Sequence, residues 1–469
     1  MEKDNEFQNG KLMPMILRFS IPAAASLLIT AIYNIVDRMF VGNFVGTSAL
    51  AGLSVCFPVS YIMMAFALDC SSGGSTLFSI FAGRGDRKRM SKSFGNSIVL
   101  VIVFELLLTA VMYLAADPIL TVFGVTDTCY EYALVYYRII VLGCVFQGLT
   151  QVFNDYVRVS GHPILGMCVT GSGAVTNILL DALFVAGFGW GVTGAAWATV
   201  IGQVVSTVLG IFLVCRHQVN VEVERSIFTP DFKLMKKIVV CGFAFWVAQL
   251  AMGLISLVYN GQLGKYGGDT AISVYAVVSS VMTFVIMPAS GISQGTQPII
   301  GNNYGAGKYK RVMDTFYLST LVSVGITCII WFAVLLFPKQ ILAAFGGNED
   351  MFAIGITGLR LNFCITPVLG FVMLATTFFQ SLERPTESII ITLLRQVVIL
   401  IPLIVILPGG FGVQGIFAAQ PVSDGIATLV SLVLLIRERK RLFAKGAADS
   451  AAADRLPEGA GSHAVGLAK

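Results

Sequence analysis

The segment GRGDRKR at residues 83–89 returns in altered form as GAGKYKR at residues 305–311, which lies 222 positions further along the chain. Other landmarks keep nearly the same separation. Positions equivalent at a shift of 222 or 221 are Ala49 and Ala271, Arg138 and Arg360, Pro163 and Pro385, and Gly191 and Gly412. A single match would mean little, but one nearly constant shift across many landmarks indicates an internal duplication.

Both basic segments follow long apolar stretches. The 469 residues are 56% hydrophobic and 12% charged, with a mean hydropathy of +0.81, whereas soluble domains carry about 25% charge. A run of about 20 apolar residues can span a bilayer as a helix. The predicted spans are 15–41, 51–82, 93–115, 131–157, 164–187, 192–215, 238–260, 271–301, 313–337, 352–380, 388–407 and 413–436. The sequence therefore predicts an all-α integral membrane protein with twelve transmembrane helices.

The duplication divides these helices into two pseudo-symmetric lobes of six. We expect an N-terminal lobe at residues 1–220, a C-terminal lobe at 221–446 and a disordered tail at 447–469, where Ala, Gly and Ser predominate. Because each copy has an even number of spans, both enter the membrane the same way up. Such repeats commonly place a substrate path between the two halves.

Lys and Arg residues set the expected orientation. If the N-terminus is cytoplasmic and the spans alternate, 25 of the 31 basic residues lie on the cytoplasmic side or in the tail. The outer loops then hold only Lys265 and Lys339. This asymmetry predicts that both termini are cytoplasmic. The net charge of +5 is thus explained by topology, and we expect no nucleic-acid partner.

Other classes of protein are disfavoured. The nine Cys residues form no CxxC pair, so neither disulfides nor a zinc site is expected. There is no GxxxxGK[ST] phosphate-binding loop and no visible nucleophile–base set. We expect no enzyme activity, no cofactor and no built-in ATPase.

Six acidic residues lie inside predicted spans, where a charge at the bilayer centre costs roughly 2.5–3.5 kcal/mol on insertion scales. They are Asp37, Asp69, Glu105, Asp155, Asp181 and Asp424. Five belong to the N-terminal lobe. At the equivalents of Asp37 and Asp155, the C-terminal lobe has Tyr259 and Thr377. We therefore expect ion chemistry in the N-terminal lobe.

The candidate ion-coupling residues combine carboxyl, amide and hydroxyl groups. Asn34 and Asp37 are three residues apart and share a helical face, as do Asn177 and Asp181 at a spacing of four. Thr199 on the sixth span could add a hydroxyl. Desolvation disfavours the anion, so such carboxyl groups could carry a proton. The same oxygens, at Asp37, Asn177 and Asp181, could hold Na⁺ instead.

Asp155 is a further candidate for ion coupling. Structural roles compete with coupling at both sites: Asp37 could pair with Arg138 inside the membrane, and Asp155 could form an ordinary surface pair with Arg158. Asp69, Glu105 and Asp424 are weaker candidates for coupling.

Soft and aromatic side chains at similar depths in both copies are candidates for a substrate cavity, because they suit a promiscuous apolar site and attract organic cations. These candidates are Met63, Met64, Phe66, Gln249, Met252, Tyr259, Met282 and Met287. For any single one, contact with lipid or a neighbouring helix is the favoured interpretation. Pro22, early in the first span, is a candidate hinge.

These features resemble the multidrug and toxic compound extrusion (MATE) family. The resemblance covers about residues 10–440, and it rests on the two lobes, on Pro22 fifteen residues before Asp37, on both Gly-x-Gly basic loops and on Asn177-x-x-x-Asp181. It looks closest to the bacterial MepA-like and DinF-like branch and implies the MATE/MOP-type fold.

The resemblance also implies residue roles. Coupling to H⁺ or Na⁺ would fall on Asp37, Asn177, Asp181 and Thr199. The NorM branch additionally uses acidic residues in spans seven and ten, and this chain has none there. A second ion site in the C-terminal lobe is therefore not expected.

The leading functional hypothesis is a monomeric antiporter in a bacterial plasma membrane. It would export amphipathic or cationic organic compounds in exchange for H⁺ or Na⁺, among membrane lipids. The alternative is a flippase for lipids or lipid-linked oligosaccharides, which would need a cationic central cavity. Four intramembrane arginines keep that alternative open: Arg38, Arg138, Arg360 and Arg395.

Overall fold

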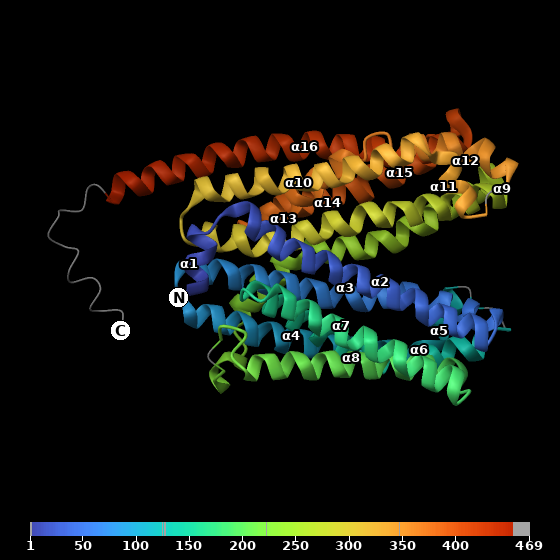
Figure 1. The fold of residues 1–469 in the computed structure, drawn as a ribbon, viewed down its shortest axis with the longest axis horizontal. Coiled ribbons are helices and arrows are strands. Elements are labelled where there is room, and N and C mark those ends of the chain that lie inside the picture. Colours follow the sequence, from blue (N-terminus) through green and yellow to red (C-terminus); the bar gives the residue numbers. More distant parts are fainter. Residues whose placement is uncertain (1, 124, 126–127, 222, 347, 454–469) are drawn as a thin grey trace.

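The computed structural model describes residues 2–123, 125, 128–221, 223–346 and 348–453. These residues form two elongated bundles of helices that lie side by side, with the helices running along the long axis (Figure 1). Among them, eleven helices are long and apolar enough to cross a membrane, and the number is twelve when one bent pair is counted as a single span. The predicted all-α fold of twelve spans is confirmed.

The N-terminal lobe contains six spans. Its helices are α1 (Glu2–Asn9), α2 (Leu12–Phe44), α3 (Thr47–Arg84), α4 (Arg87–Leu114), α5 (Ala116–Val122), α6 (Tyr130–Val159), α7 (Pro163–Asp181) and α8 (Gly191–Cys215). A π-helical turn, Ala182–Gly187, continues α7. Helices α1 and α5 are too short to span a membrane.

The C-terminal lobe follows a short 3₁₀ turn at Arg225–Phe228. Its helices are α9 (Phe232–Gly305), α10 (Tyr309–Leu336), α11 (Pro338–Ala344), α12 (Glu349–Asn362), α13 (Pro367–Ser381), α14 (Pro385–Leu393), α15 (Leu400–Ile406) and α16 (Pro408–Ala453). Helix α9 holds two spans separated by a non-helical Gly268. A π-helical turn, Leu394–Ile399, joins α14 to α15.

The duplication is visible in the backbone. Left-handed glycines occur at equivalent positions in the two lobes. The pairs, with their φ angles, are Gly46 (119°) and Gly268 (60°), Gly85 (74°) and Gly307 (74°), and Gly191 (58°) and Gly412 (57°). At the equivalent of Gly161, Glu383 adopts a positive φ of 57°, which is uncommon for a residue with a side chain. Both copies thus have a positive φ at this position, although only the first has a glycine there.

The two copies differ in their fourth spans. Helix α6 is continuous, whereas its counterpart is broken into α12 and α13, which are bent by 46°. Pro367 begins α13 and removes a backbone donor, which accounts for the break. At the C-terminus, α16 runs to Ala453, past residue 447 where the tail was predicted to begin. The remainder of that tail, 454–469, lies outside the described residues.

Glycines bring the two lobes into backbone contact along a seam, which we define as the contact of α3 with α9. A Cβ atom added at Gly83 would lie 1.9 Å from the carbonyl oxygen of Asn302. One added at Gly305, the repeat equivalent of Gly83, would lie 2.1 Å from the carbonyl oxygen of Ile80. At Gly73 the nearest backbone oxygen would be 2.0 Å away. Only glycine allows the helices to approach this closely.

Polar side chains also cross between the lobes. Arg84 forms an ion pair with Glu383 at 3.2 Å, and Arg158 Nη1 donates to Gln294 Oε1 at 3.0 Å. Gln297 Nε2 donates to the hydroxyl of Thr76. These contacts join the lobes toward one end of the molecule.

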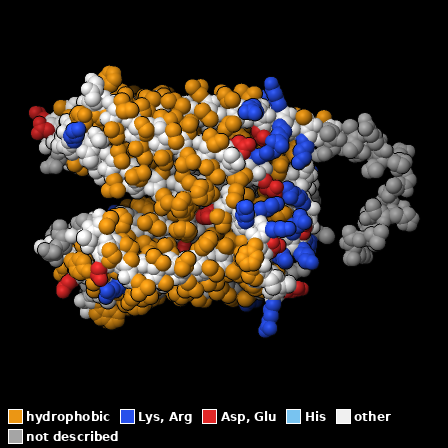
Figure 2. Space-filling view, turned by 180° about the vertical axis from the view of Figure 1, so that it is seen from behind, with side chains coloured by type: hydrophobic (Ala, Val, Ile, Leu, Met, Phe, Trp, Pro, Cys, Tyr) orange, Lys and Arg blue, Asp and Glu red, His pale blue; other side chains and the backbone are white. Residues whose placement is uncertain are grey.

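That end is also where Lys and Arg gather, whereas the lobes diverge toward the opposite end and leave an open cleft (Figure 2). Helix α1 reinforces the closed end. Asn303 Nδ2 and Arg311 Nε each donate to the carbonyl oxygen of Phe7 at 3.1 Å, and Lys308 Nζ donates to that of Gln8 at 3.2 Å. The C-terminal carbonyls of α1 are therefore satisfied by residues of the C-terminal lobe.

The substitution Gly83→Ala tests the backbone contact. The added methyl group would meet the carbonyl oxygen of Asn302, and overpacking of this kind costs about 1–3 kcal/mol. We expect a lower melting temperature for the purified protein in detergent. Gly325→Ala on α10 is the control, because nothing lies within 4 Å of its Cβ position. Equal melting temperatures for the two variants would contradict the close approach.

Candidate functional site

Two carboxyl groups meet inside the N-terminal lobe. Asp37 on α2 is 6% exposed and Asp181 at the end of α7 is fully buried. Their side chains interact directly with each other. Both oxygens of Asp181 and Oδ1 of Asp37 have no hydrogen-bond partner. Sequence spacing alone could not show that these two predicted residues lie together.

Local backbone structure helps to position Asp181. The residue immediately precedes the π-helical turn Ala182–Gly187, where the regular α-helical hydrogen-bond pattern changes. Such π turns inside helices are frequent at functional sites. The sequence offered no signal for this turn.

The predicted amide and hydroxyl neighbours divide into two groups. Asn177 Nδ2 donates to Thr199 Oγ1 at 3.2 Å, while its Oδ1 is buried without a partner. Asn177 and Thr199 therefore extend the site. Asn34 instead donates from Nδ2 to the carbonyl oxygen of Thr30 on its own helix, at 2.7 Å.

Two tyrosines at this site were not predicted. Tyr33 on α2 and Tyr136 on α6 both interact electrostatically with Asp37, and Tyr136 also interacts with Asp181. Tyr33 could have been found, because it precedes Asp37 by four residues and so shares its helical face. Tyr136 comes from another helix and carries no local sequence signal.

Asp155 lies in a different environment. Its Oδ1 accepts from Arg158 Nη2 at 2.6 Å, and its carboxylate also accepts from Ser71 and Gln151. The Asp155 and Arg158 side chains are only 3% and 4% exposed, so this is a buried pair and not the surface pair considered from the sequence. Its positive partner is fixed within the same helix.

Asp424 in the C-terminal lobe is also neutralised. Arg395, which lies in the π-helical turn Leu394–Ile399, approaches it at 3.4 Å, and Gln420 donates to both carboxylate oxygens. Tyr259, at the repeat equivalent of Asp37, is 1% exposed and stacks on Tyr275 with ring centroids 4.4 Å apart. The C-terminal lobe therefore has an aromatic pair at the position where the N-terminal lobe has the carboxyl group of Asp37.

Asp69 and Glu105 are buried, and each has one oxygen without a hydrogen-bond partner. Glu105 accepts from the thiol of Cys144 inside the N-terminal lobe. Asp69 instead lies on α3, at the seam between the lobes. Neither takes part in an ion pair within the described residues.

The predicted cavity residues are spread over several environments. Met63 and Tyr259 are 1% exposed and belong to the cores of their lobes, so neither is open to a solute in this conformation. Met252 is 42% exposed. The half-buried members are Met64, Phe66, Gln249, Met282 and Met287. Their role in a substrate cavity stays a prediction.

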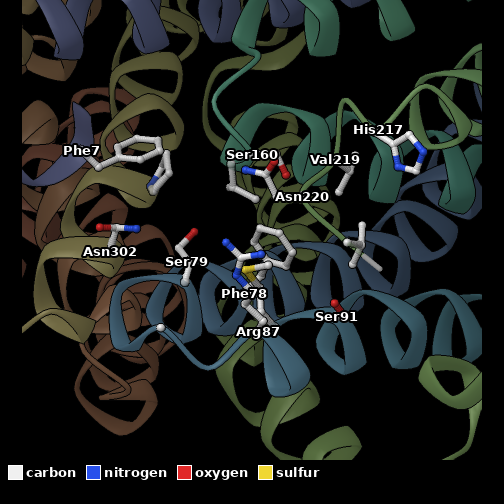
Figure 3. A pocket seen from close by; sticks show the side chains of 16 residues that line it. Phe7, Phe78, Ser79, Arg87, Ser91, Ser160, His217, Val219, Asn220 and Asn302 are labelled. Carbon is white, nitrogen blue, oxygen red and sulfur yellow. The ribbon is translucent and has the colours of Figure 1, made fainter. Parts of the chain in front are cut away.

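A separate pocket of about 240 Å³ opens at the basic end (Figure 3). Its lining comes from both lobes, from α1 and from the segment that joins the lobes, and includes Phe7, Arg87, Ser160, His217 and Asn302. The carboxyl pair is not part of its lining. Among the described residues, no cluster of three or more His, Cys, Asp or Glu could hold a metal ion.

Two repeated six-helix lobes with an intramembrane carboxyl pair define a multi-pass membrane transporter. The MatE family model matches residues 22–183 and 245–406, once in each lobe. The chain belongs to this family, whose members are transporters and not enzymes.

Similar proteins agree with this assignment. Multidrug export protein MepA of Staphylococcus saprophyticus is 24% identical over 440 residues, which cover 93% of this chain and 96% of that protein. MepA of Staphylococcus aureus (strain MSSA476) is 23% identical, with coverages of 93% and 96%. The chain is thus a transporter of the MatE family that is similar to the MepA proteins over nearly its whole length.

Solved structures show the same fold. A crystal structure of MATE in the bent conformation matches with a TM-score of 0.89 at 22% identity, covering 95% of this chain and 99% of that one. An outward-facing multidrug resistance MATE transporter of the MOP superfamily matches with a TM-score of 0.88 at 22% identity, covering 94% and 98%.

The substitution Asp155→Ala tests the buried ion pair. It leaves Arg158 without its counter-charge, and breaking one side of a buried pair costs about 3–5 kcal/mol. We expect a matching loss in the free energy of unfolding, measured by denaturant titration in micelles. The double variant Asp155→Ala/Arg158→Ala should lose less than Asp155→Ala alone. A single variant as stable as the unsubstituted protein would contradict a structural role for the pair.

Proposed function

We propose that the chain exports amphipathic, often cationic, organic compounds from the bacterial cytoplasm in exchange for H⁺ or Na⁺. The observation that carries this proposal is the pair Asp37 and Asp181. The two carboxyl groups are buried against each other inside a membrane-spanning lobe, and neither forms an ion pair with Lys or Arg among the described residues, although Arg38 acts electrostatically on Asp37. Two adjacent anions in such a place need a positive partner.

An exchangeable cation is the partner that fits. A shared proton would turn the repulsion between the two carboxyl groups into a hydrogen bond. Na⁺ would instead be coordinated by the unpartnered oxygens of Asp37, Asn177 and Asp181, with the Thr199 hydroxyl nearby. Both ions suit an oxygen-only donor set, so the coupling ion is left to experiment.

The positive-inside rule supports placing the basic end, with both termini, in the cytoplasm of a bacterial cell membrane. The closed seam then faces the cytoplasm and the cleft in Figure 2 faces outward. An export cycle must part the seam to admit a substrate. Pro22 is suited to bend α2 during this step, since the neighbouring residues Ser20 and Ala24 pack against glycines of α9.

Ion stoichiometry limits the available energy. Exchange of one H⁺ for one monovalent cation is electroneutral, so only the pH gradient would drive it, with about 1.4 kcal/mol per pH unit. Use of the membrane potential, which supplies about 2.3 kcal/mol per charge per 100 mV, requires a second ion. A pair of carboxyl groups could accept two.

The arginine positions weigh against a lipid-linked oligosaccharide flippase. Arg395 is paired with Asp424, and Arg138 is exposed with its guanidinium 5.8 Å from the ring centre of Tyr113. Arg395 therefore brings no unpaired cation to a central cavity, and Arg138 lies against an aromatic ring. A monomer is sufficient for the proposed cycle, because both lobes belong to one chain.

Asp37→Asn tests the coupling site. The amide is isosteric but cannot exchange a proton, so efflux of a fluorescent organic cation from proteoliposomes should slow by about tenfold or more, equivalent to about 1.4 kcal/mol. Gradients of pH and of Na⁺ are imposed separately, which identifies the coupling ion.

Tyr275→Phe is the matched control, since it changes the stacking partner of the repeat-equivalent Tyr259 in the other lobe and should keep the coupled rate. Equilibrium dye binding checks that Asp37→Asn folds. Normal ion-driven efflux by Asp37→Asn under both gradients would refute the role of Asp37.

A further inference from the structure

Asp69 occupies the seam between the lobes. Its carbonyl oxygen and Oδ1 lie 1.9 Å and 2.4 Å from the position that a Cβ atom of Gly242 would take on α9. The residue is 3% exposed and its Oδ1 has no hydrogen-bond partner. One turn earlier on α3, Phe66 packs edge-on against Trp246, with ring centroids 5.8 Å apart. The carboxyl group therefore lies within the contact and behind an aromatic layer.

Asp69 has no ion-pair partner in the part of the chain that the structure describes. Cys70 on the same helix interacts with both Asp69 and Glu105 of α4. On the α9 side the titratable neighbour is Cys241. Cys241 also interacts electrostatically with Lys237 and with Glu383, which follows α13. The described ion pairs do not include Asp69. An ionised Asp69 would thus be an uncompensated charge while the seam is closed.

The duplication provides an internal comparison. The equivalent of Asp69 at a shift of 222 is Gly291, which packs against α2. A Cβ atom added at Gly291 would lie 2.5 Å from Cβ of Ala24. At the equivalent position, α9 therefore packs closely against α2 without a carboxyl group. Packing does not require an acid at residue 69, so its presence calls for another explanation.

We infer that Asp69 is a second proton-binding site, separate from the pair Asp37 and Asp181, and that proton binding there accompanies closure of the seam. The inference rests on the proposed function in one respect, that the seam opens to the cytoplasm in each cycle. When it opens, water reaches the carboxyl group, which releases its proton to the cytoplasm. When it closes, the carboxylate first takes a proton from the same side. No proton crosses the membrane by this route.

The sign of the pH effect follows directly. The closed seam needs the neutral acid, whereas the open seam admits the anion. Low cytoplasmic pH therefore favours the outward-facing state and high cytoplasmic pH favours the inward-facing state. Asp69 would make the conformational equilibrium respond to cytoplasmic pH.

A native thiol can report the opening. Cys241 is 6% exposed in the seam, next to Gly242, whereas Cys215 is exposed at the end of α8. N-Ethylmaleimide labelling of each cysteine is measured by peptide mass spectrometry from pH 6 to pH 9 in proteoliposomes, and the Cys241 rate is divided by the Cys215 rate. In the unsubstituted protein this ratio should rise with pH, by at most about tenfold per pH unit where one group titrates.

Asp69→Asn should lower the ratio and remove the alkaline rise, because the amide stays neutral. Asp69→Gly introduces the residue found at the equivalent position 291 and should have the same effect. It shows whether the result for Asp69→Asn comes from misfolding of that variant. Glu105→Gln is the matched control: it removes another buried acid that lies inside the N-terminal lobe and should keep the rise.

A repeat of the comparison in the Asp37→Asn/Asp181→Asn background separates this inference from the proposed function, since coupled transport should be lost there while the rise persists. The inference is overturned if both Asp69 variants keep the rise, if Glu105→Gln abolishes it equally, or if Cys241 of the unsubstituted protein is unreactive at every pH.

Discussion

The two lobes touch through glycine backbone, and the remainder of the architecture depends on that contact. Lipid offers no hydrophobic drive for helices to associate, so close packing of small residues must supply it. Gly83 and Gly305 fulfil this role at equivalent positions, and each would clash with the opposite backbone if it carried a side chain. A contact made largely of glycine backbone, with few side chains crossing it, can separate and re-form between rigid lobes, which is what alternating access requires.

Duplication gave both lobes one scaffold, and the differences between them mark where the chemistry diverged. The left-handed turns at Gly85 and Gly307 have the same φ angle of 74°. The fourth spans, in contrast, differ by the break before Pro367. Asp37 faces Asp181 in one lobe, whereas Tyr259 stacks on Tyr275 in the other. The two copies are alike in these turns and differ in the side chains of the proposed ion site.

Hydropathy was sufficient to predict eleven spans and the region of the bent pair, because a membrane-crossing helix must be predominantly apolar. The spacing of Asn177 and Asp181 likewise predicted a shared face. Contacts between helices that are distant in the sequence could not be predicted, because no local sequence pattern relates Tyr136 to Asp37, or Asp69 to Gly242. The π turn after Asp181 could not be predicted either, because tertiary packing decides such defects more than local propensity does.

The intramembrane acids fall into two kinds, according to how their charge is balanced. Asp155 and Asp424 have permanent partners in Arg158 and Arg395, so their charge is constant throughout any conformational cycle. Among the described residues no ion pair is formed by the other four acids, which are Asp37, Asp69, Glu105 and Asp181. Arg38, the neighbour of Asp37 in the sequence, acts on that carboxyl group electrostatically. A fixed ion pair locks helices together but cannot link a lobe movement to an ion gradient. Only acids whose counter-charge enters and leaves with solvent access can do so, and this is the role that we propose for acids of the N-terminal lobe and its seam.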